Sequence, residues 1–419
     1  MTARGVAIGI DIGTSGVRAA LVDATGAMRA TGAVAVAAER RRDPAAWWEG
    51  VESALAALRA QADLGDVAAL AVDGTSGTVL AVDRVGAPLG PASLYNDPAD
   101  PALIARIGAA APAQSGAHGA TSPAAKLLAL QDTPGIARML HQADWIAGRL
   151  CGRFDVSDEN NALKTGYDPV ARRWPDWLAA TGARTALLPL VAEPGTPVGR
   201  ITAALAPRLG LPDTVRIAAG TTDGCAAFLA TGAAETGEAV TSLGSTLTLK
   251  QLSDRPLFAP EYGVYSHRLG DRWLAGGASN TGGAALARHF DAAALAALST
   301  RIDPARESGL DYYPLPGTGE RFPIADPAMP ARETPRPADD AAFLYGLLEG
   351  IARVEALGYR RLAELGGPPL ASVRSVGGGA RNAVWTAIRA RVLGAAMPPA
   401  RSEEAAVGAA LLALRAATA

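Results

Sequence analysis

The sequence predicts an α/β protein built from two halves of similar organisation. Each half begins with short strand-like runs separated by glycine and hydroxyl residues, and helical patterns follow these runs. The runs cover residues 6–10, 18–22 and 32–38 in the first half, and residues 239–243, 246–249, 263–268 and 273–275 in the second. This similarity indicates an internal duplication of structure, although the sequence itself does not repeat.

Composition excludes several classes of function. The chain has 419 residues, 49% hydrophobic and 19% charged, which is enough for two or three domains with sizeable cores. A net charge of −2 leaves no electrostatic footprint for nucleic acid or an anionic membrane, so we expect neither partner. Cys151, Cys225 and four histidines lack metal-ligand spacing, and we expect a reducing, cytoplasmic location. Asp11 interrupts the first apolar stretch too early for a signal peptide, and no apolar run is long enough to span a bilayer.

The remaining elements follow in order along the chain. Asp43 and Pro44 predict a helix N-terminus, and the helix continues to about Ala60. We expect strands at 67–72, 79–83, 215–219 and 373–376, and helices at 123–130, 135–150, 225–231, 341–365, 383–393 and 403–417. Residues 312–337, rich in proline and glycine, are expected to be irregular but ordered, because their aromatic side chains can be buried.

Residues 8–18 form the most informative motif. They place an acid, two hydroxyls and three glycines at the tip of a predicted hairpin. Glycines let backbone N–H groups approach phosphate oxygens, hydroxyls add donors, and Asp11 could face Mg²⁺ through water. No Gly-Lys-Ser/Thr follows, and a strand comes next instead of a helix, so this is neither a Walker loop nor a dinucleotide fingerprint. The alternative is an ordinary glycine-rich hairpin.

Further polar turns of the same kind occur at other strand ends. They surround Asp73, Asp223 and Gly378, and residues 243–246 join two strands. In open α/β sheets ligands bind outside the strand ends. Two Gly/Ser/Thr hairpins, one in each half, could face each other across a cleft and hold the phosphates of a nucleotide. The set predicts nucleotide-dependent phosphoryl transfer.

The sequence resembles sugar kinases of the FGGY family. The first hairpin resembles that family's phosphate-1 element, residues 243–246 its phosphate-2 element, and residues 377–382 with Trp385 its adenosine element. Residues 319–323 and 326–327 also fit the family pattern. The resemblance implies two actin-like ATPase (ribonuclease H-like) domains with a cleft between them. We expect the domains at 1–230 and 231–419, with the last helix packing back on the first domain.

A finer resemblance is to the D-ribulose kinase (xylulose-kinase-like) subgroup of cyanobacteria and plants. It is carried by residues 73–80, 238–246, 276–280 and 309–316. It implies transfer of the γ-phosphate of ATP, with Mg²⁺, to the terminal hydroxyl of D-ribulose, and D-xylulose is the runner-up acceptor. Pentuloses differ by the direction of one hydroxyl, so one or two pocket hydrogen bonds decide between them.

The resemblance also implies roles for individual residues. Asp223 would be the general base, as an aspartate is in protein kinases, and the alternative is that it caps the following helix. Asp11 would act in catalysis, touching Mg²⁺ through water and the reactive end of the sugar, or else bond its own turn. Ser76, with Gly74 and Thr75, would bind a sugar hydroxyl, or Ser76 is simply a turn serine.

The implied nucleotide contacts come from both halves. Donors to the β- and γ-phosphates would be Thr14, Ser15, Gly16, Val17 and Arg18 in the first half and Gly244, Ser245 and Thr246 in the second; Gly378, Gly379, Ala380, Arg381 and Asn382 would wall the adenine and ribose. Arg18 could instead be a solvated strand residue, and Trp385 a core residue.

Two further resemblances are weaker. Residues 95–97 resemble a sugar-contacting run, but the arginine usual soon after the aspartate is missing here. Lys126 resembles a family lysine, with a solvated helix lysine as the alternative. Two other function classes stay open: a non-catalytic sugar or nucleotide sensor on the same fold, and a dinucleotide-dependent oxidoreductase. The absence of a strand–GxGxxG–helix unit speaks against the oxidoreductase.

Overall fold

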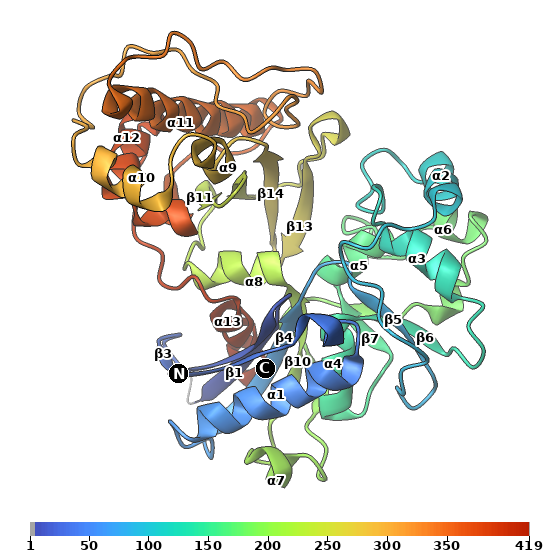
Figure 1. Ribbon diagram of the computed structural model, residues 1–419. Coiled ribbons are helices and arrows are strands. Elements are labelled where there is room, and N and C mark those ends of the chain that lie inside the picture. The colour runs from blue at the N-terminus through green and yellow to red at the C-terminus, as the bar shows by residue number, and fades with distance from the viewer. Residues whose placement is uncertain (1–4, 419) are drawn as a thin grey trace. The chain divides into compact units, whose positions relative to one another are not determined.

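The structure is a computed structural model that describes residues 5–418. The chain divides into two compact units (Figure 1). Unit 1 comprises Met1–Ala230, His267–Gly270 and Glu404–Ala419, and unit 2 comprises Thr231–Ser266 and Asp271–Glu403. Each unit contains a sheet packed against helices, which confirms the predicted α/β class.

Unit 1 is organised around a six-stranded sheet of order β3-β2-β1-β4-β10-β9. Its strands are β1 (Val6–Ile12), β2 (Gly16–Val22), β3 (Met28–Ala35), β4 (Val67–Gly74), β9 (Pro197–Arg200) and β10 (Arg216–Thr222). The three central strands β1, β4 and β10 run parallel, so their carboxyl ends lie at one edge. The register pairs Asp11 with Asp73, and Thr221 with the same Asp73.

Helices cover both faces of this sheet (Figure 1). One face carries Ile8, Ile10 and Ile12 and packs on α1 (Pro44–Arg59), which begins at the predicted N-cap Asp43. The other face is rich in alanine and packs on α13 (Ala405–Thr418), which also contacts α8 (Asp223–Ala230).

Small residues let α13 approach very closely. A Cβ added to Gly9 would lie 1.9 Å from the Ala406 carbonyl oxygen, and one added to Gly408 would lie 1.8 Å from that of Ala226. Only glycine fits at these two positions, because real Cβ contacts are never so short.

At the periphery of unit 1, one element differs from the sequence prediction. Its elements are β5 (Val79–Val82), α2 (Pro101–Ala110), α3 (Pro123–Leu130), β6 (Arg138–His141), α4 (Gln142–Cys151), β7 (Val156–Asp158), α5 (Glu159–Thr165), α6 (Asp176–Ala180), β8 (Leu190–Ala192) and α7 (Ala206–Leu209). The helix predicted at 135–150 is wrong in its first part, where β6 pairs antiparallel with β5. The buried Met139 and Leu140 fit either helix or strand spacing, and pairing with a distant strand decides between them.

Unit 2 has a five-stranded sheet of order β13-β14-β12-β11-β15. The strands are β11 (Glu238–Leu243), β12 (Leu247–Ser253), β13 (Tyr265–Leu269), β14 (Arg272–Ser279) and β15 (Ser372–Val376), and the helices are α9 (Gly283–Ala287), α10 (Ala292–Ser299), α11 (Asp340–Glu364) and α12 (Ala383–Leu393). The irregular segment predicted at 312–337 is confirmed, and its Tyr312 and Phe322 are buried.

A buried ion pair ties three elements of unit 2 together. Arg389 of α12 donates two hydrogen bonds of 2.6 Å to Glu355 of α11, and both side chains are fully buried. The hydroxyl of Thr241 in β11 donates to the same carboxylate at 2.5 Å. A charge buried this deeply is tolerated when it is paired and hydrogen-bonded in this way.

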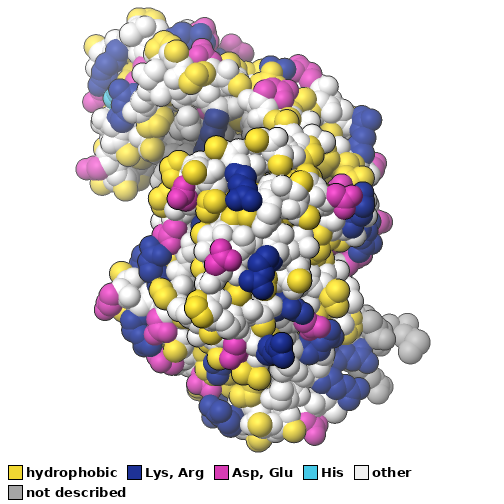
Figure 2. Space-filling model, turned by 90° about the vertical axis from the view of Figure 1, so that its right-hand side faces the viewer, with side chains coloured by type: hydrophobic (Ala, Val, Ile, Leu, Met, Phe, Trp, Pro, Cys, Tyr) yellow, Lys and Arg dark blue, Asp and Glu magenta, His cyan; other side chains and the backbone are white. Residues whose placement is uncertain are grey.

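The surface carries both signs of charge. Figure 2 shows basic and acidic side chains interspersed over the face in view, in keeping with the net charge of −2. None of the described helices combines the length and apolar character needed to cross a bilayer.

His141 gives a test of the fold in unit 1. It is buried at the start of α4, and burial lowers its pKa to about 3. The unfolded chain therefore binds a proton near the usual pKa of about 6.5 while the folded chain does not, so acidification favours unfolding. We expect this residue to reduce the free energy of unfolding by about 1.4 kcal/mol per pH unit below about pH 6.5.

The measurement is urea unfolding of the wild type and His141→Gln between about pH 7 and about pH 5. The variant should lose this part of the pH dependence. The exposed His118 supplies the control variant, His118→Gln, which should keep it. Equal pH slopes in the wild type and His141→Gln would contradict the prediction.

Candidate active site

Three acidic side chains meet at the carboxyl edge of the unit 1 sheet. Asp11 is the next-to-last residue of β1 and is 6% exposed, Asp73 lies opposite it in β4 and is fully buried, and Asp223 follows β10 directly. Burial raises the pKa of Asp11 and the negative charge of Asp223 raises it further, against contacts with Asp73 and Arg18. Burial raises the pKa of Asp73 well above its usual range, and the charges of Asp11 and Asp223 add to this.

The state of Asp73 follows from its surroundings. Among the described residues, no donor bonds either of its carboxyl oxygens. A buried carboxyl beside two others avoids the cost of an isolated charge by holding a proton. Burial beside two other carboxyl groups therefore favours the protonated form of Asp73 over the ionised form.

Asp223, the predicted base, directly follows the last residue of β10. It is the first residue of α8, and its Oδ1 accepts a hydrogen bond of 2.6 Å from the backbone N–H of Gly224. This bond reaches the next residue along the chain, whereas an N-cap side chain accepts from the second or third helical N–H. The electrostatic effect of Asp223 on Asp11 and Asp73 places it beside them as well.

The first hairpin is a tight turn between β1 and β2. The N–H of Gly13 donates to the Gly16 carbonyl at 2.9 Å, which leaves Thr14 and Ser15 exposed at the tip. Arg18 lies on β2 with its Nη1 3.5 Å from Asp11 Oδ2, and its side chain is 47% exposed. The predicted phosphate-binding residues 14–18 therefore form the tip of the hairpin and the start of β2, and Val17 in this strand is buried.

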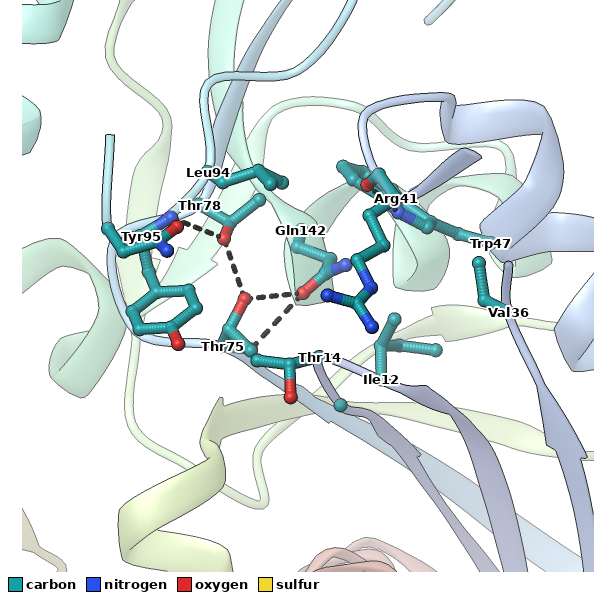
Figure 3. Close-up of a pocket in the computed structure, with 12 residues that line it drawn as sticks. Ile12, Thr14, Val36, Arg41, Trp47, Thr75, Thr78, Leu94, Tyr95 and Gln142 are labelled. Carbon is teal, nitrogen blue, oxygen red and sulfur yellow. Dashed lines mark hydrogen bonds between the residues drawn. The ribbon is translucent and has the colours of Figure 1, made fainter. Parts of the chain in front are cut away.

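A small cavity of about 70 Å³ lies beside this hairpin (Figure 3). Its lining residues are Ile12, Gly13, Thr14, Val36, Arg41, Trp47, Thr75, Thr78, Leu94, Tyr95, Asn96 and Gln142. The Oε1 atom of Gln142 accepts hydrogen bonds from Thr75 N at 3.2 Å and from Thr75 Oγ1 at 2.9 Å. Thr75 Oγ1 also lies 2.6 Å from Thr78 Oγ1, so the loop after β4 is fixed to the start of α4.

The structure brings some predicted substrate residues to this cavity and leaves others outside its lining. Thr75 lines it, together with Thr14 of the hairpin. Gly74 packs against Gln142, where an added Cβ would lie 3.2 Å from Oε1. The hydroxyl of Ser76 is buried, with no hydrogen-bond partner among the described residues, and it is not part of the lining. Asp11 and Asp223 also lie outside the lining.

Sequence reasoning missed two polar residues of the cavity. Arg41 is the middle member of an arginine run, residues 40–42, that immediately precedes the predicted helix cap Asp43. Gln142 is the first residue of α4, inside the segment whose strand went unrecognised. The arginine run was the one signal that could have been followed.

The loop at 94–97 is anchored by residues distant in sequence. Asp97 pairs with Arg42, which supplies an arginine partner from the segment before α1 instead of the missing one after Asp97. Lys126 is buried and donates to the carbonyls of Gly77 at 3.2 Å and Leu94 at 2.5 Å. The solvated alternative for Lys126 is therefore wrong, and burial lowers its pKa to about 8.

Unit 2 contains a much larger cavity of about 840 Å³. It gathers both motifs predicted for this half, namely Gly244, Ser245, Gly378, Gly379, Arg381 and Asn382; Thr246 and Ala380 belong to the same turns but not to the lining. The opposite wall, which the sequence did not indicate, comes from α9 and α10 and includes Leu286, Leu295, Ala296 and Ser299.

The two motifs of this cavity are held by backbone contacts. Gly283 N–H donates to the Gly244 carbonyl at 2.8 Å, which fixes the hairpin to the start of α9. An added Cβ at Gly379 would lie 2.5 Å from the Trp385 ring, so this turn requires glycine. Trp385 is both a core residue, donating to Leu348 O at 3.1 Å, and part of the lining. A roomy cavity of aliphatic and aromatic side chains with a polar rim suits a flat heterocycle bearing a hydroxylated group.

The described residues contain no cluster of three or more His, Cys, Asp or Glu side chains arranged to hold a metal ion. The acidic group at Asp11 is compatible with a hydrated ion that keeps most of its water ligands, as Mg²⁺ does beside phosphates.

Comparisons with known proteins agree on one family. The sequence profile of the N-terminal domain of the FGGY family of carbohydrate kinases matches residues 6–115, and that of the C-terminal domain matches residues 239–417. A xylulose kinase of Escherichia coli (strain K12) is 29% identical over 92% of this chain and 84% of its own length.

Solved structures show the same fold. A structure described as a xyloylose kinase from Brucella ovis has a TM-score of 0.86 and 26% identity, covering 99% of this chain and 90% of that one. A xylulose kinase from Bifidobacterium adolescentis has a TM-score of 0.83 and 22% identity, covering 99% and 93%. These likenesses confirm the predicted two-domain, actin-like ATPase fold.

The role of Lys126 can be tested by Lys126→Met, which keeps the length of the side chain and removes its ammonium group. Two carbonyls lose their donor, so we expect the free energy of unfolding to fall by about 1–3 kcal/mol in urea titrations. Arg84→Met, at an exposed position, is the control and should change stability little. A stability equal to wild type would show that Lys126 does not hold the two loops.

Proposed function

Since the chain belongs to the FGGY family of carbohydrate kinases, we propose that it transfers the γ-phosphate of ATP to the terminal hydroxyl of a ketopentose. The observation that carries this proposal is the meeting of Asp11, Asp73 and Asp223 at the ends of three parallel strands, in the same unit as a small cavity lined by both polar and apolar side chains. A base for a hydroxyl group and a compact polar pocket for a sugar are the two parts that such a reaction needs in unit 1.

Asp223 serves as the general base in the proposed reaction. Its carboxylate accepts the proton of the acceptor hydroxyl while that oxygen bonds to the γ-phosphorus. The bond between the γ-phosphorus and the oxygen bridging it to the β-phosphorus breaks, and ADP leaves. Protonated Asp73 keeps the negative charge of the acidic group low, which lets Asp11 and Asp223 stay ionised beside it.

The nucleotide contacts are divided between the units. Residues 14–18 of unit 1 and residues 244–246 of unit 2 supply backbone N–H and hydroxyl donors to the phosphates. The large cavity of unit 2 takes the adenosine between the turn at Gly378 and Gly379 and the wall of α10. Exposed hydroxyls at Thr14 and Ser15 support this assignment.

Mg²⁺ fits the donor set of unit 1. Hard carboxylate oxygens are its preferred protein ligands, and Asp11 would hold it through water. When bound, the ion neutralises charge on the phosphates. Arg18, 3.5 Å from Asp11, holds that carboxylate in place and adds positive charge on the same side.

Two lines of support favour different ketopentoses. The strings at 73–80, 238–246, 276–280 and 309–316 favour D-ribulose, which gives D-ribulose 5-phosphate. D-xylulose is the second candidate, because relatives that match most of the chain are named xylulose kinase. An ADP-release assay with ATP and Mg²⁺ tests both with D-ribulose, L-ribulose, D-xylulose, L-xylulose and glycerol. Selective turnover of a pentulose supports the proposal, and silence with every acceptor overturns it.

Asp223→Asn tests the assigned base. The amide keeps the size of the side chain but cannot accept the proton, so kcat should fall by about 10²–10⁴-fold while ATP still binds. Steady-state kinetics and nucleotide titration give the two readouts. Asp213→Asn, at an exposed position, is the matched control and should keep wild-type turnover. Near-normal turnover in Asp223→Asn would remove Asp223 from this role.

Ala296→Trp tests the adenosine cavity. An indole in the wall of α10 occupies space that the heterocycle needs, so the KM for ATP should rise at least about tenfold with little change in the KM for the sugar. Ala297→Trp places the same group outside the lining and controls for the effect on the helix. An unchanged KM for ATP in Ala296→Trp would place the adenosine elsewhere.

A further inference from the structure

Arg41 brings a positive charge into the small cavity without a partner there. Of the described residues that line this cavity, it is the one with a charged side chain. Its Nε is buried, and no described residue accepts a hydrogen bond from it. Its backbone is fixed, because the Arg41 carbonyl accepts a bond of 2.9 Å from Trp47 Nε1. Figure 3 shows its guanidinium extended between Gln142 and Ile12.

The two arginines next to Arg41 differ from it, because each has a carboxylate partner. Arg40 pairs with Glu49 at 2.6 Å and also with Asp43, and Arg42 pairs with Asp97. In a run of three arginines, the outer two therefore have carboxylate partners, and the middle one is directed into the cavity. Surface arginines generally remain solvated or pair with acids, so an unpaired guanidinium in a pocket points to a ligand.

Gln142 presents a second donor beside Arg41. Its Oε1 is occupied by the two bonds from Thr75, so the amide nitrogen is the group left for a ligand. Figure 3 shows that nitrogen on the side facing Arg41. The hydroxyls of Thr75 and Thr78 bond each other, and Thr78 Oγ1 accepts from Tyr95 N at 3.0 Å. At this end of the cavity, Arg41 and the amide nitrogen of Gln142 offer donors, one of them charged, while the hydroxyl protons of Thr75 and Thr78 are already used and each of these oxygens keeps one lone pair.

The N–H donors of Arg41 and Gln142 restrict the kind of oxygen that can bind beside them. Guanidinium and amide N–H groups have no lone pairs to offer, so they suit an oxygen that carries lone pairs and no proton. A carbonyl or carboxylate oxygen meets this requirement. The hydroxyl of a polyol can accept the same bonds, but its own proton then needs a separate acceptor, which a carbonyl or carboxylate oxygen does not.

We propose that Arg41, with Gln142, determines acceptor specificity by binding a carbonyl or carboxylate oxygen at the non-reacting end of the acceptor. This rests on the proposed function, since it assigns the cavity to the acceptor. A ketopentose can react at its terminal hydroxyl only in the open-chain form, in which that hydroxyl is not part of a ring and the keto oxygen is free. A cavity of about 70 Å³ admits only one end of such a molecule.

Binding and turnover of matched acceptors test the proposal. D-Ribulose carries the keto oxygen, ribitol has a hydroxyl in its place, and D-ribonate carries a carboxylate. Calorimetry without nucleotide should show that wild-type protein binds D-ribulose or D-ribonate about 10- to 100-fold more tightly than ribitol. Whichever of D-ribulose and D-ribonate binds more tightly shows whether the site takes a keto oxygen or a carboxylate oxygen. Equal affinity for all three would overturn the proposal.

Variants of the arginine run locate the effect. Arg41→Met should abolish the preference over ribitol by weakening the favoured acceptor, while leaving ribitol binding and the KM for ATP unchanged. Arg41→Lys keeps the charge without the planar fork and should restore part of the preference. Arg40→Met, which removes a paired arginine of the same segment, is the control and should behave like wild type. Melting curves establish that each variant is folded.

The outcomes separate the two proposals. Loss of affinity for all acceptors alike, or a higher KM for ATP in Arg41→Met, would overturn the specificity role and point to a structural or phosphate-binding one. Turnover of a pentulose with an unchanged preference in Arg41→Met would leave the kinase function standing without this inference. Selective, Arg41-dependent binding of D-ribulose or D-ribonate with no phosphoryl transfer would support the inference and overturn the kinase function.

Discussion

The parallel register of β1, β4 and β10 is the constraint on which the chemistry of unit 1 depends. Backbone pairing sets Asp11 against Asp73, and Asp223 follows one residue after β10 ends at Thr222. A shift of one residue in the pairing of one strand would turn its aspartate to the opposite face of the sheet and separate it from the other carboxyl groups. The pairing of β4 with β10 shifts its register between Ala218 and Thr221, and Gly220 lies there so close to Val72 that an added Cβ would sit 1.7 Å from its carbonyl oxygen.

Two buried acidic groups, one in each unit, differ in how their charge is handled. In unit 2, Glu355 is neutralised by Arg389 and bonded by Thr241, which makes it part of the scaffold. In unit 1, Asp73 has no donor among the described residues, and burial raises the pKa values of Asp11 and Asp73. Satisfied buried networks stabilise a fold, whereas groups with perturbed pKa values gather where chemistry occurs.

How far sequence reasoning reached depended on the range of the interactions involved. Local signals located the Asp43 cap of α1, and the limits of α3 and α12 match the predicted 123–130 and 383–393. Strand β6 was missed because its partner β5 lies far back in the chain. The partners of Lys126 and Asp97, and the position of Arg41 in the cavity, depend on folding of distant loops, which no local pattern encodes. Glycine turns were found because their backbone requirements are local.

The placement of α13 has a consequence for how the protein is made. Its alanine face closes one side of the unit 1 sheet against β1, which leaves the ribosome among the first segments, yet all of unit 2 is translated before α13 emerges. The apolar face of β1 and β4 must therefore wait uncovered during elongation while unit 2 can already fold. The alanine-rich face of the unit 1 sheet is therefore covered only after unit 2 has been translated, and chaperones have that interval in which to act.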